Sequence, residues 1–500
     1  MEAILQAASL ILDPYVMMVI LLSAAFGLFV GAVPGLTATM ATALLVPITF
    51  FMPPVPSLAA IVTATAMAIF AGDIPSALLR IPGTPASAAY TDEAYAMTRK
   101  GEAELALGIC LSTSVIGGLF GAVVLSSSAP LLAEIALKFS GYEYFWLALL
   151  GLTCAAFISS DQPVKGLLSL LIGLLIASVG IDPTTGQPRF TFGSVELLGG
   201  IGLIPAMIGM FAITEIFRSV TALQALPPMD QRPIGNIFKG LGHVLFRYKT
   251  NLFRGNVIGV IVGALPGAGA DIAAWISYAI AKKFSKEPEK FGTGNPEGLV
   301  DAGAANNSAL GGAWVPALVF GIPGDSITAI VIGVLYVKGM NPGPTVFLNQ
   351  PELIYAVFLS FFLANILLLP LGYVAIKSAK QILRVPREVL MPVILMFCVV
   401  GTFAINNTVF DVGVMLCLGL VAYLMEENGI PIAPAILGLV LGQLIEESFM
   451  TSMIKANGNL LMFFSRPISA VLGITVILIW CWPLMRWAIN YSRRQTKPVH

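Results

Sequence analysis

The sequence contains little charge. Only 11% of its 500 residues are Asp, Glu, Lys or Arg, and 57% are hydrophobic, whereas a soluble protein carries about 25% charged residues. Long apolar stretches recur from end to end, so this composition predicts a polytopic protein of the lipid bilayer without a sizeable soluble domain. Acidic and basic residues balance at 27 each, and a net charge of zero gives no reason to expect a nucleic-acid partner.

Histidine and paired cysteine are also scarce. The two histidines are His243 and His500, which leaves no basis for a histidine metal site. All five cysteines lie in apolar runs and none belongs to a CxxC pair, so we interpret them as small buried hydrophobes. The first residues carry no basic stretch, and we therefore expect no cleaved signal peptide.

Long hydrophobic runs are what the sequence has in abundance. Stretches long and apolar enough for a tilted helix in a bilayer core of about 30 Å are 15–33, 103–126, 143–158, 164–180, 197–217, 352–376, 388–404, 411–427, 432–447 and 468–488. The regions 36–98 and 255–340 are apolar but dense in Gly, Pro, Ser, Thr and Asn, which predicts short, broken or re-entrant helices. The expected number of crossings is about eleven to thirteen.

A proline–glycine motif occurs twice in each half of the chain. The first half has GAVPG at 31–35 and IPGTP at 81–85, and the second half has GALPG at 263–267 and IPGDS at 322–326. Proline and glycine interrupt helices, and an interruption within a membrane is tolerated where the broken backbone lines a protected cavity. Interruptions at matching positions of two halves are typical of the binding site of a secondary transporter.

The spacing of these motifs predicts two related membrane repeats. The motifs recur at a nearly constant offset of about 230–240 residues. We expect a first repeat at 1–217, a basic cytoplasmic linker with an interfacial helix at 218–254, a second repeat at 255–450, and a C-terminal helix with a cytoplasmic tail at 451–500. The fold class is thus an all-α polytopic membrane protein with broken or re-entrant helices.

Basic residues predict that the two repeats have opposite orientations. The loops 282–290 and 377–387 each contain four Lys or Arg residues, whereas their first-half counterparts, 46–56 and 134–143, contain none and one. Because basic loops stay in the cytoplasm, equivalent loops should lie on opposite sides of the membrane. The N-terminus is then periplasmic and the C-terminus cytoplasmic.

The broken helices supply candidate ligands for an anion and a cation. A new helix N-terminus favours an anion and freed carbonyl groups favour a cation. The predicted substrate-binding residues are Pro34, Gly35, Thr37, Pro82, Gly83, Thr84, Ser87, Pro323, Gly324 and Ser326. The predicted cation-binding residues are Gly267, Asp271, Asn306, Asn307 and Asp325. The alternative interpretation is structural: packed kinks, hydrogen bonds between helices, and helix caps for Asp271 and Asp325.

Two further charged residues lie beside the first IPG motif. Asp73 is a carboxyl group at membrane depth, which is a functional hypothesis by default. Arg80 either clamps a substrate carboxylate, reaches the membrane interface or pairs with Asp73.

Taken in order, these motifs resemble the large membrane subunit of the tripartite tricarboxylate transporters, the TctA family. The resemblance covers about residues 20–460 and is carried by segments 31–36, 81–85, 91–92, 99–103, 263–269, 305–307, 321–326 and 338–344. The chain departs from it at Asp73 and Arg80, where the family often has small uncharged residues, and at Glu93, where it often has glycine.

The resemblance implies a bacterial inner-membrane symporter and not an enzyme. A periplasmic binding protein would deliver a carboxylate, such as citrate, another organic acid or an aromatic acid, and a small four-helix membrane subunit would assist. Uptake would be driven by an ion gradient, commonly Na⁺, with no other cofactor. It also implies ancestry shared with elevator-type carriers whose two hairpin tips meet at the substrate.

Two other classes remain as alternatives. An integral-membrane enzyme acting on a lipid-linked substrate would need a catalytic constellation such as paired acids with Mg²⁺ or a histidine. A channel would need a continuous polar stripe along its pore.

Overall fold

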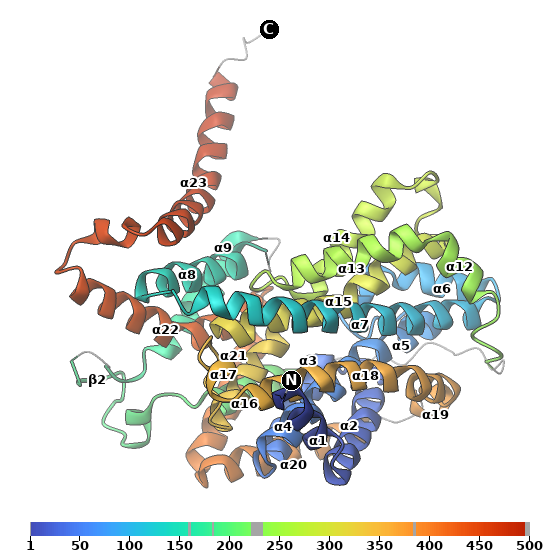
Figure 1. The fold of residues 1–500 in the computed structure, drawn as a ribbon, viewed down its shortest axis with the longest axis horizontal. Helices are drawn as coiled ribbons and strands as arrows, with labels where there is room; N and C mark the ends of the chain where they lie inside the picture. The colour runs from blue at the N-terminus through green and yellow to red at the C-terminus, as the bar shows by residue number, and fades with distance from the viewer. Residues whose placement is uncertain (1, 159–161, 183–184, 222–233, 384–386, 496–500) are drawn as a thin grey trace.

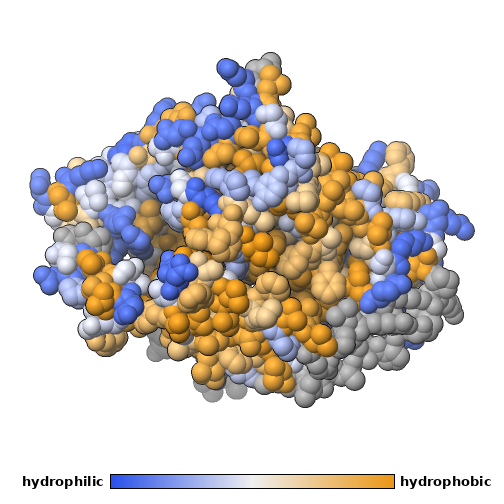
Figure 2. Space-filling model, turned by 90° about the horizontal axis from the view of Figure 1, so that it is seen from below, coloured by the Kyte–Doolittle hydropathy of each residue, from blue (hydrophilic) through white to orange (hydrophobic). Residues whose placement is uncertain are grey.

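The computed structural model describes residues 2–158, 162–182, 185–221, 234–383 and 387–495, and these residues are almost entirely helical (Figure 1). Within this part, eight helices are long and apolar enough to cross a membrane: Pro14–Ala32, Pro54–Leu79, Ala103–Ala136, Leu203–Val220, Pro351–Lys377, Val389–Asn406, Val409–Glu427 and Ala433–Lys455. Figure 2 shows a face on which hydrophobic side chains form a broad area with hydrophilic ones at its margins. The chain is a multi-pass membrane protein.

The two halves consist of the following elements in chain order. The first half contains α1 (Glu2–Ile11), α2 (Pro14–Ala32), α3 (Ala38–Phe50), α4 (Pro54–Ala71), α5 (Asp73–Leu79), η1 (Ser87–Ala89), α6 (Thr91–Arg99), α7 (Ala103–Ala136), α8 (Gly141–Ile158), α9 (Pro163–Ala177), β1 (Gly180–Ile181), β2 (Pro188–Arg189), η2 (Glu196–Gly199), α10 (Leu203–Met207), η3 (Ile208–Ile213) and α11 (Thr214–Thr221). Strands β1 and β2 pair antiparallel.

The second half contains α12 (Leu241–Arg247), α13 (Lys249–Gly263), α14 (Gly269–Phe284), η4 (Pro288–Lys290), α15 (Pro296–Phe320), α16 (Ser326–Val337), α17 (Val346–Asn349), α18 (Pro351–Lys377), α19 (Ala379–Ile382), α20 (Arg387–Asn406), α21 (Val409–Glu427), α22 (Ala433–Lys455), η5 (Leu460–Phe464) and α23 (Pro467–Gln495). Each of the ten predicted spans coincides with one of these helices or with the series α10–η3–α11. The predicted linker contains α12 and the start of α13, and its residues 222–233 lie outside the described residues.

Glycine and alanine permit a close helix contact that recurs in both halves. A Cβ atom on Gly31 of α2 would lie 2.4 Å from the Ala68 carbonyl oxygen of α4, and one on Gly263 of α13 would lie 2.3 Å from that of Ala309 in α15. Such distances exclude a larger residue, because backbone atoms of the neighbouring helix cannot withdraw. The pair α2 and α4 therefore has the same glycine-mediated packing as the pair α13 and α15.

The helices that precede the two IPG motifs also end in the same way. Arg80 and Gly321 both have left-handed backbones, with φ of 60° and 67°. The next amide donates back across this turn, from Ile81 to the Pro75 carbonyl and from Ile322 to the Pro316 carbonyl, both at 3.3 Å. One helix differs from expectation, since α15 runs unbroken through 25 residues of a region predicted to be fragmented.

Several helices of the second half pack against elements of the first half. Helix α22 packs against α8 and α9, and α21 packs against η3 and α10, while α7 and α18 run along α15 and α4 (Figure 1). Gly173 of α9 touches the backbone of Ala435, and Gly209 of η3 touches that of Met415. The two halves therefore form one interlocked bundle.

A buried carboxylate joins α6 to the loop between α14 and α15. Glu93 is fully buried and accepts hydrogen bonds from the backbone amides of Gly292, Gly294 and Asn295 at 2.5–2.7 Å and from the Tyr278 hydroxyl at 2.8 Å. These donors satisfy the carboxylate and convert an irregular loop into a defined anion cradle.

We expect Glu93→Ala to lower the thermal unfolding temperature in detergent, because it leaves three amide donors without their acceptor, each costing about 1–3 kcal/mol if it stays buried. Glu287→Ala, at an exposed pair with Lys290, is the control and should have little effect. Equal unfolding temperatures for both variants would contradict the prediction.

Candidate functional site

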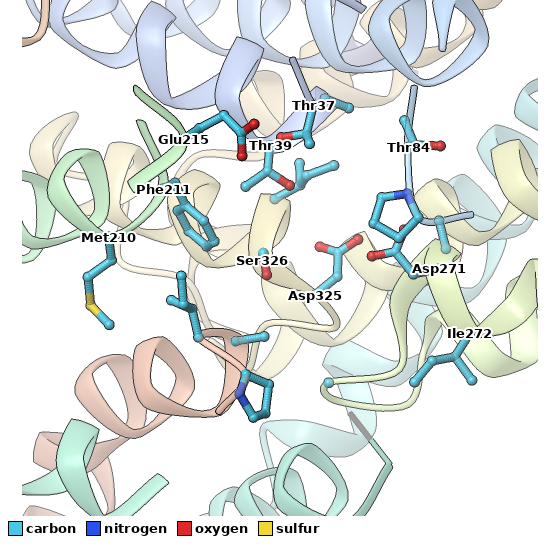
Figure 3. A pocket seen from close by; sticks show the side chains of 18 of the residues that line it. Thr37, Thr39, Thr84, Met210, Phe211, Glu215, Asp271, Ile272, Asp325 and Ser326 are labelled. Carbon is cyan, nitrogen blue, oxygen red and sulfur yellow. The ribbon is translucent and has the colours of Figure 1, made fainter. Parts of the chain in front are cut away.

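The four Pro-Gly loops converge on one cavity of about 530 Å³ (Figure 3). One side of the cavity is lined by residues that lie in or directly after the four motifs. They are, motif by motif, Thr37, Ala38 and Thr39; Thr84 and Pro85; Gly267, Ala268, Ala270, Asp271 and Ile272; and Asp325, Ser326 and Ile327. Segments separated by almost 300 residues in the chain thus meet at one place. A volume of this size lies within the range of about 300–1,000 Å³ typical of small-molecule sites.

Three helices begin at this cavity. Thr37 caps α3 by accepting from the Met40 amide at 3.1 Å. Asp325 caps α16 by accepting from the Thr328 amide at 2.8 Å, and the Thr328 hydroxyl lies 2.9 Å from the Asp325 amide in return. Helix α14 starts at Gly269, beside Asp325. The first-turn amides and the positive ends of three helix dipoles are therefore gathered around one volume.

The first IPG segment forms a compact tip. The Gly83 amide donates to the Gly72 carbonyl at 3.2 Å, and a Cβ atom on Gly83 would lie 2.4 Å from the Gly72 Cα atom. Thr84 and Ser87 exchange side-chain to backbone hydrogen bonds, both at 3.1 Å. Ser87 thus holds the tip together, and Thr84 lines the cavity.

The two loops of the second half are joined directly. The Gly267 amide donates to the Gly324 carbonyl at 2.8 Å, and Gly269 lies against the side chain of Asp325. Asp271 faces both the Asp325 carboxylate and the backbone amide of Ala86 in the first tip. Figure 3 shows Asp271 and Asp325 on the same side of the cavity.

The wall of the cavity opposite the motif loops comes from η3, α11, α21 and the start of α22. Met210 and Phe211 belong to η3, a π-helical turn, and such turns are frequent at functional sites. Arg218 of α11 contacts Glu215 at 2.9 Å and also pairs with Glu426 of α21, and all three line the cavity. None of these three was predicted as a ligand. The signal in the sequence was an acid and a base three residues apart at the end of an apolar run.

Acidic groups outnumber basic ones at the cavity. The carboxyl groups of Asp271, Asp325, Glu215 and Glu426 line it, and of the described basic residues only Arg218 does. An anion in this volume meets favourable helix ends but also several carboxylates, and the repulsion decreases only when cations or protons are present.

The structure brings some of the predicted residues together and places others behind them. Thr37, Thr84, Gly267, Asp271, Asn306, Asp325 and Ser326 line the cavity. Pro34, Gly35, Pro82, Gly83, Ser87, Pro323, Gly324 and Asn307 are not among its lining residues. They shape the loops or pack against neighbouring helices.

The two adjacent asparagines have different surroundings. Asn306 lines the cavity, and its Nδ2 atom donates to the Tyr90 hydroxyl at 2.9 Å. Asn307 instead donates to the Ser114 hydroxyl of α7 at 2.7 Å. Both Oδ1 atoms are buried without a hydrogen-bond partner among the described residues.

The suggested pair of Arg80 with Asp73 is wrong. Arg80 forms an exposed ion pair with Asp92 at 2.8 Å, because its left-handed backbone directs the chain away from α5 at this point. Asp73 is fully buried and accepts from the Tyr90 hydroxyl at 2.6 Å.

A second cavity, of about 800 Å³, lies at the other end of α16. Gly333, Tyr336 and Val337 of α16 line it, together with Arg189 and Glu446, which form a two-point ion pair at 2.7 and 3.0 Å. The 12 residues of α16 therefore separate two cavities.

Comparison with known families identifies the chain. The model of the tripartite tricarboxylate transporter TctA family matches residues 17–437, a range that contains every loop of the site. The chain belongs to the TctA family. This is a transporter family whose members are subunits of tripartite systems, and the match confirms the resemblance inferred from the motifs.

Two relatives of this TctA chain come from Agrobacterium vitis. One, described as an uncharacterized 52.8 kDa protein in the TAR-I ttuC' 3' region, is 36% identical over 469 residues, which is 92% of each chain. The other, described as an uncharacterized protein in the TAR-II ttuC' 3' region, is 35% identical over 222 residues, 44% of this chain and 92% of the relative. No solved structure matches.

Proposed function

We propose that this TctA chain is the permease subunit of a binding-protein-dependent importer that moves a carboxylate with cations, principally Na⁺. The observation that carries the proposal is the cavity at which four Pro-Gly loops and three helix N-termini meet. Helix ends suit an anion, and the surrounding carboxyl groups favour the entry of a cation with it. The TctA family favours a tricarboxylate such as citrate as the anion.

The polar groups of the cavity form two sets, one suited to the carboxylate substrate and one suited to the cation. Thr37, Thr84 and Ser326 can donate to a substrate carboxylate beside the amides of α3 and α16. The oxygens of Asp271, Asp325 and Asn306 and the carbonyls around Gly267 suit a hard alkali cation. Asn307, Ser87 and the motif prolines and glycines act by shaping the loops that carry these ligands.

Two features support alternating access by movement of the loop-bearing helices. The glycine contacts and left-handed turns of the two halves match, as expected for related repeats. The cavities at the two ends of α16 lie between the motif helices and a wall formed by α10, η3 and α22. Sliding of the motif helices against this wall would expose the substrate first to one side of the membrane and then to the other, as in elevator-type carriers.

The partners follow from this function. In the bacterial inner membrane, with the N-terminus periplasmic and the C-terminus cytoplasmic, a periplasmic binding protein supplies the carboxylate and a small four-helix membrane subunit completes the complex. The integral-membrane enzyme has no specific observation in its favour.

The test is uptake of radiolabelled citrate by proteoliposomes that contain this chain with its two partner subunits. An inward Na⁺ gradient should drive accumulation that stops when the gradient is dissipated or the binding protein is omitted. Other di- and tricarboxylates compete in the same assay and define the substrate. Absence of gradient-driven uptake for every carboxylate supplied would refute the proposal.

Opposite orientation of the two repeats can be tested with two matched exposed lysines. In a variant lacking the five native cysteines, Lys138→Cys should react with a membrane-impermeant thiol reagent in intact cells. Lys377→Cys, in the equivalent loop 377–387 of the second half, should react only after permeabilisation, because its loop is cytoplasmic under the positive-inside rule. Labelling of both positions from the same side would exclude an inverted repeat.

A further inference from the structure

Asp73 is a buried carboxyl group in which one of the two oxygen atoms has no hydrogen-bond partner among the described residues. It begins α5, directly after Gly72, and its side chain is fully buried. Its Oδ1 atom accepts from the Tyr90 hydroxyl at 2.6 Å, while Oδ2 has no hydrogen-bond partner among the described residues.

Among the described residues, the groups that face Asp73 supply no positive charge. Tyr90 and Cys110, the titratable groups that face it, are both neutral in their protonated forms. Of the other helices packed on α5, α4 has no titratable side chain and α2 only the distant Tyr15. The α6 acids are engaged elsewhere, Glu93 with the loop at 292–295 and Asp92 with the exposed Arg80. The basic Arg99 of α6 is exposed, and Glu104 of α7 accepts from the Gly235 amide. An ionised carboxylate in such a place costs several kcal/mol, and a proton on Oδ2 removes this cost.

A chain of hydrogen bonds connects this group to the transport cavity. Because the Tyr90 hydroxyl donates its proton to Asp73, it must accept from Asn306, whose Nδ2 lies 2.9 Å away. Asn306 lines the cavity. The buried Tyr90 thus links Asp73 to a residue of the cavity wall.

The hydrogen bond from Tyr90 to Asp73 also holds the base of the first tip. Gly72, next to Asp73, accepts from the Gly83 amide at 3.2 Å and from the Ser76 hydroxyl at 2.8 Å. Tyr90 follows η1, at the other end of the tip. The bond from Tyr90 to Asp73 therefore closes the segment that presents Thr84 to the cavity.

We propose that Asp73 is a proton-binding site that couples the first tip to proton movement, an inference that rests on the proposed transport function. The O–H bond at Oδ2 breaks when the tip opens and the proton passes to cavity water; it forms again when the tip closes. The charge left after proton loss is stabilised by one hydroxyl alone, so deprotonation favours the open tip. The proton is a second coupling ion beside the cation in the cavity.

Infrared spectroscopy of the full-length protein in nanodiscs tests the site without transport. At neutral pH the carboxylic acid C=O band should decrease in Asp73→Asn by the intensity of one group per chain. The matched control Asp92→Asn, at an exposed ion pair, should leave the band unchanged. Tyr90→Phe should keep the band but shift its frequency, because the hydrogen bond to Oδ1 is lost. An unchanged band in Asp73→Asn, or an unshifted band in Tyr90→Phe, overturns the proposal.

Transport assays test the coupling. In proteoliposomes, Asp73→Asn should retain exchange of internal for external carboxylate but lose at least about tenfold in proton-driven accumulation, since a fixed neutral group can bind substrate without carrying a proton. Accumulation equal to wild type, or loss of Na⁺ dependence with proton coupling intact, overturns the proposal. Failure of the wild type to exchange any carboxylate would instead refute the transport function and leave the infrared result standing.

Discussion

Replacing Gly324 or Gly83 by alanine is expected to decrease carboxylate uptake strongly while the protein still reaches the membrane. A Cβ atom on Gly324 would lie 2.7 Å from the Gly263 carbonyl oxygen and 2.8 Å from the Ala313 Cα atom, and one on Gly83 would lie 2.4 Å from the Gly72 Cα atom. These are backbone neighbours, which cannot yield as a flexible side chain would. The loop itself must move, together with the cavity-lining Thr84 or Ser326 that it carries.

The expected magnitude follows from the cost of overpacking. Forcing a methyl group into a well-packed site costs about 1–3 kcal/mol, which corresponds to roughly a five- to hundred-fold decrease in the population of the intact loop. Initial rates of citrate uptake, normalised to the amount of reconstituted protein, measure this decrease.

Gly413→Ala is the matched control. A Cβ atom there meets nothing within 4 Å, and alanine favours the helix α21 in which it lies, so uptake should be unchanged. Wild-type rates in Gly324→Ala and Gly83→Ala would show that the loop backbones do not form the transport site.

The adjacent residues Asn306 and Asn307 are expected to differ sharply in their effect on Na⁺ dependence. Both are buried amides with an unpartnered Oδ1 atom, but only Asn306 lines the cavity. Asn306→Ala removes one neutral oxygen ligand, a loss of about 1–3 kcal/mol. The Na⁺ concentration for half-maximal uptake should then rise roughly five- to hundred-fold.

Asn307→Ala provides the control because it deletes the same chemical group one residue away, on the side of Ser114. Its Na⁺ dependence should stay much closer to wild type, and Asn306→Ala should affect the substrate concentration for half-maximal uptake less than that for Na⁺ when Na⁺ is saturating. A larger Na⁺ effect in Asn307→Ala would move the cation site to the interface with α7. An effect on substrate alone would assign Asn306 to the carboxylate.

The local sequence determined where the helices break. Proline lacks an amide proton and glycine adopts backbones closed to other residues, so the four motif loops could be predicted before any contact was known, although the unbroken α15 between two of them was not. The left-handed turn at Gly321 follows the same logic, whereas Arg80 adopts this backbone although it is not a glycine, which the sequence did not indicate. The matched spacing of the motifs likewise predicted that their loops belong to one site.

The sequence could not determine which side chains face that site. Successive residues on a helix point about 100° apart, and α15 is buried on nearly every side from Gly298 to Val319, so its apolar pattern indicates no face. Only the packing of α7 and the first tip around α15 decided that Asn306 meets the cavity and Asn307 meets Ser114.

The sequence by itself thus determined the membrane class, the helix breaks and the family, because these depend on composition and local backbone chemistry. The tertiary structure alone decided the partners of charged residues. Asp73 bonds to Tyr90, Arg80 pairs with Asp92, and Arg218 joins Glu215 to Glu426 across more than 200 residues. Such pairings follow from which helices pack together, and in a uniformly apolar chain no sequence period specifies that arrangement.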